Sequence, residues 1–208
     1  QGGDLRRPWI GASGQPVTPD LMRAIGIDRP AGVMLTRIHP GSPAARAGLE
    51  IGDVLLALNN RSVDDPKALR FRVATAVANK PTTIQFWRDG KPMNASITPV
   101  FPPFDPPPDT TLLGGQHPLS GISVSNLSPG LADQIGFAGD PEGVIIFEIA
   151  ARSPARRVGF RPGDVVLSLN GADIQSVKQL AALLREQFTV WDISVRRGDR
   201  VINAVFRS

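Results

Sequence analysis

The residues that could support catalysis in this chain are few and lie far apart in the sequence. A serine hydrolase needs a nucleophile, a base that accepts its proton and a group that orients the base. The two imidazoles are His39 and His117, and residues 11–14 place Ser13 in a loose Gly-x-Ser-Gly pattern. No G-x-S-x-G turn, the pattern that exposes a nucleophilic serine, is present. We therefore predict that Ser13 lies in a turn or loop, that His39 and His117 are surface loop residues, and that the chain contains no catalytic residue.

The sequence also lacks the residue patterns of a metal site or a cofactor site. The chain has no cysteine, which removes disulfides, thiolate nucleophiles and cysteine zinc ligands. Two isolated histidines without an H-E-x-x-H pattern do not make a zinc site, and no G-x-x-x-x-G-K-S/T phosphate loop occurs. We expect no metal and no cofactor.

The basic balance of the chain raises the question of nucleic acid. The net charge is +4, from 23 Lys and Arg against 19 Asp and Glu, and the chain has no tyrosine. The tightest basic groups are pairs, such as Arg6-Arg7 and Arg156-Arg157, whereas a nucleic-acid site gathers basic residues on one face. We predict a solvated, arginine-rich surface and no nucleic-acid partner. No apolar run approaches the roughly 18 residues of a membrane span, so we also expect no membrane span.

A long internal repeat organises the chain. Residues 32–69 match residues 143–180 at an offset of 111, with 16 identities in 38 positions. Upstream, Gly11 pairs with Gly121 at an offset of 110. A copy of about 90 residues is large enough for a core of its own. We predict a first domain over residues 1–100, a Pro-rich linker over 101–117 and a second domain over 118–208.

The proline-rich stretch between the copies, residues 101–109, reads Phe-Pro-Pro-Phe-Asp-Pro-Pro-Pro-Asp. Proline fixes φ and lacks an amide donor, so this composition favours extended polyproline II. We interpret the stretch as a semi-rigid spacer; the alternative is a polyproline ligand for an SH3-type partner.

Each copy follows the same order of expected elements. Buried strands are predicted at 32–38 and 54–58, with a short helix between them that begins at Ser42 as N-cap. A longer helix opens at Asp65, and its core stripe is Leu69, Val73 and Val77. Two closing strands follow, and an extra short helix is expected near the start of each domain, beginning at Thr18 and at Ser128. The fold class is therefore α+β, mainly β, with two domains that are each a partly closed antiparallel β-sheet capped by helices.

One extended pattern occurs in both copies: Gly-Val-x-φ-x-x-φ-x-x-x-Ser-Pro-Ala-x-x-x-Gly-φ-x-x-Gly-Asp-φ-φ-φ-x-φ-Asn, where φ is apolar. It resembles the PDZ signature in its circularly permuted bacterial form. The whole chain resembles the C-terminal part of the HtrA/Deg family of periplasmic serine proteases, which carry two PDZ domains after a trypsin-like domain. Residues 7–12, Arg-Pro-Trp-Ile-Gly-Ala, resemble the stretch that joins protease and first PDZ domain in that family.

The resemblance implies peptide binding by β-strand addition, with a glycine-containing loop that turns amides toward the terminal carboxylate. Ser120 departs from the apolar residue usual in that loop. The carboxylate-binding loops would be Trp9, Ile10, Gly11 and Ala12 in the first copy, and Leu119, Ser120, Gly121 and Ile122 in the second. Groove residues on the main helices would be Arg70, Ala74, Ala181 and Arg185, for which the alternative is a solvent-facing helix surface.

The resemblance also implies a function. The chain would be the peptide-recognition and regulatory region of an HtrA/Deg-type protease in periplasmic protein quality control. Its partners would be C-terminal or unfolded peptides and an upstream protease domain of the same parent chain. The alternatives are a stand-alone scaffold or adaptor, and a module that builds a homo-oligomer.

Overall fold

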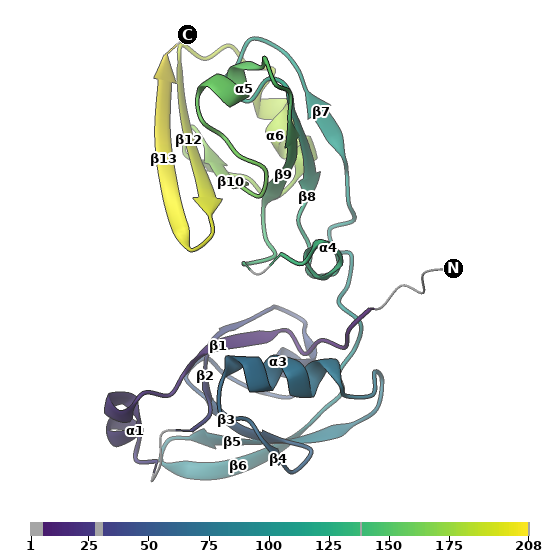
Figure 1. Ribbon diagram of the computed structural model, residues 1–208, viewed down its shortest axis with the longest axis vertical. Coiled ribbons are helices and arrows are strands. Elements are labelled where there is room, and N and C mark those ends of the chain that lie inside the picture. The colour runs from purple at the N-terminus through teal and green to yellow at the C-terminus, as the bar shows by residue number, and fades with distance from the viewer. Residues whose placement is uncertain (1–5, 28–30, 138, 208) are drawn as a thin grey trace. The chain divides into compact units, whose positions relative to one another are not determined.

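The structure is a computed structural model that describes residues 6–27, 31–137 and 139–207 (Figure 1). The chain divides into two compact units, residues 1–102 and 103–208. Each unit is a mainly β domain built on one antiparallel sheet with three helices, which confirms the predicted fold class.

The sheet of the first unit has the strand order β1-β2-β3-β5-β6, with β4 paired to β3. The strand β1 therefore lies at one end of this sheet. The strands are β1 (Ala12–Pro16), β2 (Val33–Ile38), β3 (Val54–Leu58), β4 (Arg61–Ser62), β5 (Thr82–Arg88) and β6 (Lys91–Ile97), and the helices are α1 (Pro19–Ile25), α2 (Pro43–Arg46) and α3 (Pro66–Ala74).

The sheet of the second unit has one strand more, in the order β13-β12-β10-β9-β8-β7, with β11 paired to β10. The additional strand is β7, which lies outside β8, the counterpart of β1. The strands are β7 (Thr111–Leu113), β8 (Ile122–Asn126), β9 (Val144–Ile149), β10 (Val165–Leu169), β11 (Ala172–Asp173), β12 (Val190–Arg197) and β13 (Arg200–Arg207), and the helices are α4 (Pro129–Ile135), α5 (Pro154–Arg157) and α6 (Val177–Leu183).

The predicted helix starts are confirmed by their caps. The Ser42 hydroxyl accepts a hydrogen bond from the Ala45 amide at 3.2 Å, and the Asp65 carboxylate accepts one from the Ala68 amide at 2.7 Å. Such side-chain acceptors satisfy amides that the first helical turn leaves without a partner. The extra short helices, α1 and α4, are also present and end at glycines with positive φ.

The predicted extension of the core stripe to Val77 is wrong. Helix α3 ends at Ala74, and Val77 is 63% exposed. Thr75 ends the helix, since both its amide and its hydroxyl donate to the Phe71 carbonyl. The chain then turns through Asn79, whose φ is +60°. Leu69 and Val73 are buried as expected.

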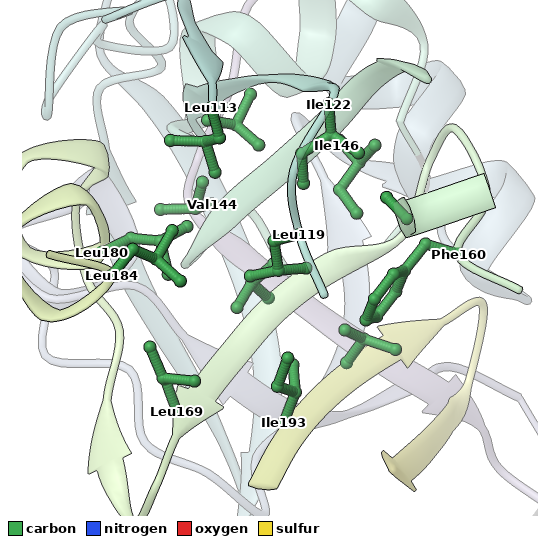
Figure 2. Packing of buried hydrophobic residues seen from close by; sticks show 14 of the residues in the cluster. Leu113, Leu119, Ile122, Val144, Ile146, Phe160, Leu169, Leu180, Leu184 and Ile193 are labelled. Carbon is green, nitrogen blue, oxygen red and sulfur yellow. The ribbon is translucent and has the colours of Figure 1, made fainter. Parts of the chain in front are cut away.

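Each unit has its own apolar core. In the second unit, side chains from the sheet, from α6 and from the loop before β8 pack together (Figure 2). Leu119, Ile122, Leu180 and Ile193 are completely buried in this cluster. Burial of one large aliphatic side chain stabilises a domain by about 1.5–3 kcal/mol, so these side chains contribute strongly to the stability of their own unit.

An ion pair between a buried aspartate and a partly exposed arginine recurs in both units. In the first, Nε and Nη2 of Arg88 donate to the two carboxylate oxygens of Asp53 at 2.6 and 2.7 Å. In the second, Arg197 binds Asp164 in the same two-pronged way, at 2.7 Å for both bonds. Both aspartates are buried, and the hydrogen bond to Asp53 raises the pKa of Arg88 above its usual value. The Gly-Asp turns of the repeat are thus tied to the end of β5 and β12.

Residues 103–113 pack against the second unit. The Gly130 amide donates to the Pro103 carbonyl at 2.7 Å, and the Asn126 side-chain amide donates to the Pro107 carbonyl at 2.9 Å. The structure thus places this part of the expected 101–117 linker within the second unit.

Candidate functional site

The loop before β1 is shaped by Gly11. Its φ is +72°, a region that side-chain-bearing residues rarely adopt. A Cβ built on Gly11 would lie 2.1 Å from the Cβ of Ser42, which caps α2. Both the backbone conformation and the close approach to α2 therefore require glycine here.

The carbonyls of this loop have partners within the domain. The Ile10 carbonyl accepts a hydrogen bond from the Ala44 amide at 2.9 Å, and the Gly11 carbonyl accepts one from the His39 amide at 2.8 Å. Among the described residues, by contrast, no atom accepts a hydrogen bond from the amide of Ile10 or of Gly11. Two successive amides without acceptors can together bind an anion. The arrangement suits a carboxylate, because buried N–H groups are almost always paired.

The strand that follows this loop offers an unpaired edge. Within the described part of the chain, β1 pairs with β2 alone, with Ala12 opposite Ile38 and Ser13 opposite Arg37. Helix α3 lies beside β1 (Figure 1) and is in contact with it. An edge strand flanked by a helix can accept an extended peptide as a further strand.

The groove residues predicted on the main helices differ in exposure. Arg70 is exposed on α3, and Ala74 is half-buried. In the second unit, Ala181 is half-buried against the core, and Arg185 is exposed just beyond α6. Contact of these four side chains with a peptide stays a prediction.

An open hollow of about 490 Å³ lies at the far end of β1. It is lined by Gln15, Pro16, Thr18, Asp20, Leu21 and Ala24. An antiparallel guest strand with its terminus near Gly11 would run toward this hollow. The sequence predicts α1 only as an extra short helix and gives no signal for the hollow.

The loop before β8 repeats the glycine geometry. Gly121 has a φ of +85°, and a Cβ built on it would lie 2.3 Å from the Cβ of Ser153, the cap of α5. Its carbonyl accepts a hydrogen bond from the Ala150 amide at 2.9 Å, as the Gly11 carbonyl does from His39. The backbone framework of the two loops is therefore the same.

The amides of the second loop, however, are occupied. The Ser120 amide donates to the His117 carbonyl at 3.1 Å, and the Gly121 amide donates to the Leu113 carbonyl at 2.8 Å. The edge of β8 is occupied too, because β7 pairs with it. The expectation of carboxylate-binding amides at Leu119, Ser120, Gly121 and Ile122 therefore meets a loop whose two central amides already bind chain carbonyls.

The two histidines and Ser13 lie in different surroundings. The predicted loop position of Ser13 is wrong, because Ser13 lies in strand β1, where it is exposed. His39 lies edge-on to Trp9, with ring centroids 5.5 Å apart. The predicted surface position of His117 is wrong, because this residue is buried next to Trp191, with ring centroids 5.9 Å apart. Burial lowers the pKa of His117 from its usual value. Its Nε2 lies 3.1 Å from the Gly114 carbonyl. In residues 6–27, 31–137 and 139–207, no group of three side chains suited to a metal occurs.

No helix in the described residues is long and apolar enough to cross a bilayer.

Comparison with known proteins gives consistent matches. A model of the PDZ domain matches residues 34–88 and 145–190, one segment in each unit. The chain is similar to a probable periplasmic serine endoprotease DegP-like of Pseudomonas putida (strain W619), with 32% identity over 190 residues that cover 88% of this chain and 39% of the relative. It is also similar to the periplasmic serine endoprotease DegP of Escherichia coli (strain K12), with 26% identity over 200 residues that cover 96% of this chain and 39% of the relative.

A solved structure of the HtrA3 PDZ domain bound to a phage-derived ligand (FGRWV) is 26% identical. The match covers 45% of this chain and 85% of that chain, with a TM-score of 0.39. The chain spans about two fifths of the length of the curated relatives named above, and it corresponds to their PDZ portion. It consists of two PDZ domains in tandem and belongs with the PDZ region of the HtrA/DegP family of serine endoproteases.

Proposed function

We propose that the first domain binds the C-terminal segment of another polypeptide as an additional strand beside β1. The unpaired amides of Ile10 and Gly11 carry this proposal, because they lie at the start of an open strand edge. The terminal carboxylate accepts hydrogen bonds from these amides, and main-chain bonds to β1 supply affinity that does not depend on sequence.

The pairing in the second unit supports a specific register for this guest. There, Leu113 lies opposite Ile122, Leu112 opposite Ser123 and Thr111 opposite Val124. Transferred by the repeat, the last residue of a guest lies opposite Ala12 and the two preceding residues lie opposite Ser13 and Gly14. Pro16 has no amide donor, so ladder bonds from β1 to the guest end before it.

We further propose that the chain serves a serine endoprotease of the periplasm as its substrate-capturing and regulatory region. The names of the relatives support this role, since they are periplasmic serine endoproteases. A Kd in the micromolar range, equivalent to about −8 kcal/mol, suits transient capture of unfolded chains.

The test compares one fluorescently labelled peptide in two chemical forms, with a free C-terminal carboxylate and with a C-terminal amide. Fluorescence polarisation with the full chain should show binding of the acid and at least about tenfold weaker binding of the amide, since a charge-assisted hydrogen bond contributes about 1.5–3 kcal/mol. Equal affinity of the two forms for every peptide that binds would refute carboxylate capture. Strong self-association in light scattering, without peptide binding, would favour an oligomerisation module instead.

A further inference from the structure

We propose that Thr111–Leu113 is an internal ligand of the second PDZ domain and closes its groove to free peptides. This segment forms β7, which adds to the edge of β8 in the antiparallel sense. The equivalent edge of β1 in the first domain has no such neighbour among the described residues. The inference concerns the second groove and is independent of binding at the first.

The hydrogen bonds of the segment reproduce those expected of a bound terminus. The chain runs from Thr111 toward the glycine loop, and the carbonyl of Leu113 accepts the hydrogen bond of the Gly121 amide at 2.8 Å. A carbonyl oxygen of the chain therefore lies where a guest would place a carboxylate oxygen. The corresponding amide of Gly11 has no such partner within the described residues.

The side chains of the segment alternate as those of a bound peptide would. Leu113 is 5% exposed and belongs to the core cluster, whereas Leu112 is 70% exposed. Figure 2 shows Leu113 in the same cluster as the loop residue Leu119, the α6 residue Leu180 and the C-cap residue Leu184. The pocket at the end of this groove therefore accepts an apolar residue of leucine size.

Three anchors upstream hold the segment, and their residues are specific to the second copy. The first two are the bonds from Gly130 to Pro103 and from Asn126 to Pro107 described above. The third is the bond that the Asp109 amide donates to the Ser125 hydroxyl at 3.1 Å.

At the repeat offset of 110, the first copy has Asp20, Pro16 and Gln15 in place of Gly130, Asn126 and Ser125. A Cβ at Gly130 would lie 2.9 Å from the Phe104 ring, so the first anchor requires glycine. The anchor residues and the strand β7 thus occur together in the second copy, and the first copy has other residues at the anchor positions.

Covalent attachment strengthens the competition against free peptides. After Leu113 the chain turns through Gly114 and Gly115 and returns to the loop before β8. There the His117 carbonyl accepts a hydrogen bond from the Ser120 amide. A tethered ligand acts at an effective concentration in the millimolar range. A free peptide of micromolar affinity must displace it, so its apparent affinity falls by the fraction of domains in which the segment is released.

The first experiment measures amide hydrogen exchange in the isotopically labelled full chain by NMR. We expect the Gly121 amide to exchange at least about tenfold more slowly than the Gly11 amide, because only the former has a bonded acceptor. Similar, fast exchange at both glycines would overturn the proposal.

The second experiment adds the peptide Asp-Thr-Thr-Leu-Leu with a free carboxylate, which is the sequence of residues 109–113. In the wild-type chain, shifts should appear at residues of β1 and α3 and not at residues of β8. In the variant Leu113→Asp, whose carboxylate cannot remain in the apolar pocket, β8 signals should also shift, with an apparent affinity at least about tenfold higher than in the wild type.

The matched control is Leu112→Asp, which adds the same charge one residue away on the exposed face and should leave the second groove closed. If Leu113→Asp unfolds the domain, Leu113→Ala provides the milder release. The proposal would be overturned if the peptide bound at β8 of the wild type as tightly as at β8 of a folded Leu113 variant. It would also be overturned if the peptide did not bind at β8 of that variant. Loss of shifts at β1 alone would count against the function proposed for the first domain.

Discussion

The buried ion pair of the first domain allows a stability prediction that can be calculated from its geometry. The substitution Asp53→Asn keeps the shape of the side chain but removes its charge and replaces one acceptor by a donor. Three hydrogen bonds reach this carboxylate, two from Arg88 and one from the Glu50 amide at 2.8 Å. The Asp53 side chain is 1% exposed, whereas that of Arg88 is 20% exposed.

Breaking a buried ion pair costs about 3–5 kcal/mol. Arg88 retains bonds to the Gly48 carbonyl and to the Glu50 carboxylate, both at 2.8 Å. We therefore expect the lower end, a loss of about 3 kcal/mol in the free energy of unfolding of the first domain. For a domain of this size, such a loss lowers Tm by about 12–24 °C.

Differential scanning calorimetry of the full chain tests this value. Asp53→Asn should shift the transition of the first domain, and Asp164→Asn should shift that of the second. The matched control is Asp20→Asn, which breaks the exposed ion pair between Asp20 and Arg23. The side chain of Arg23 is 71% exposed and that of Asp20 is 88% exposed. The change in the free energy of unfolding should therefore stay within about 0.5 kcal/mol. The reasoning is refuted if Asp53→Asn destabilises the chain no more than Asp20→Asn does.

Three further outcomes are expected. Gly11→Ala should weaken peptide binding at least about tenfold in fluorescence polarisation, because a strained φ and the clash with α2 distort the amide site; Gly26→Ala, with the same φ of +72° but open space around its Cβ, should bind normally, and equal loss in both would refute the steric argument. Burial lowers the pKa of His117, so the unfolded chain takes up its proton first and the stability of the second domain should fall as pH drops below about 6.5; His117→Gln should flatten this dependence in urea titrations, and an unchanged slope would contradict the assignment. Leu180→Ala, at a completely buried position, should cost about 2–5 kcal/mol in the second domain, which thermal unfolding measures; a loss below about 1 kcal/mol would contradict its place in the core.

Local rules predicted the elements that depend on local interactions. Ser42 and Asp65 were identified as caps because a short polar side chain bonds an amide three residues on, and the structure has both bonds. The same periodicity rule failed at Val77. The apolar spacing continues past the helix there, but the hydroxyl of Thr75 ends the helix first.

The path of the proline-rich stretch depends on residues distant in sequence. Polyproline II composition describes an isolated segment, whereas residues 103–113 are bound by Asn126, Ser125 and the Gly130 amide. The one available signal was a difference between the copies, since the repeat places Pro16 where the second copy has Asn126. Similarly, the repeat pattern contains the Gly-Asp pair of each copy, but the arginine that pairs with each aspartate lies more than thirty residues downstream.

The glycine loops were recognisable because their geometry follows from the residue type, but the state of their amides was not. Gly11 and Gly121 have the same sign of φ and the same clash with a serine cap. Whether an amide faces an open groove or the Leu113 carbonyl is decided by tertiary pairing, which the repeat does not encode.

The pairing of β7 with β8 also determines how many peptide termini one chain can bind. Two similar modules in one chain normally offer avidity toward substrates with several free ends. Here β8 has neighbours on both sides, whereas β1 has one neighbour among the strands that the structure describes, so titration should saturate at one terminus per chain. Doubling the number of ends on a substrate should then bring only the statistical factor of about two.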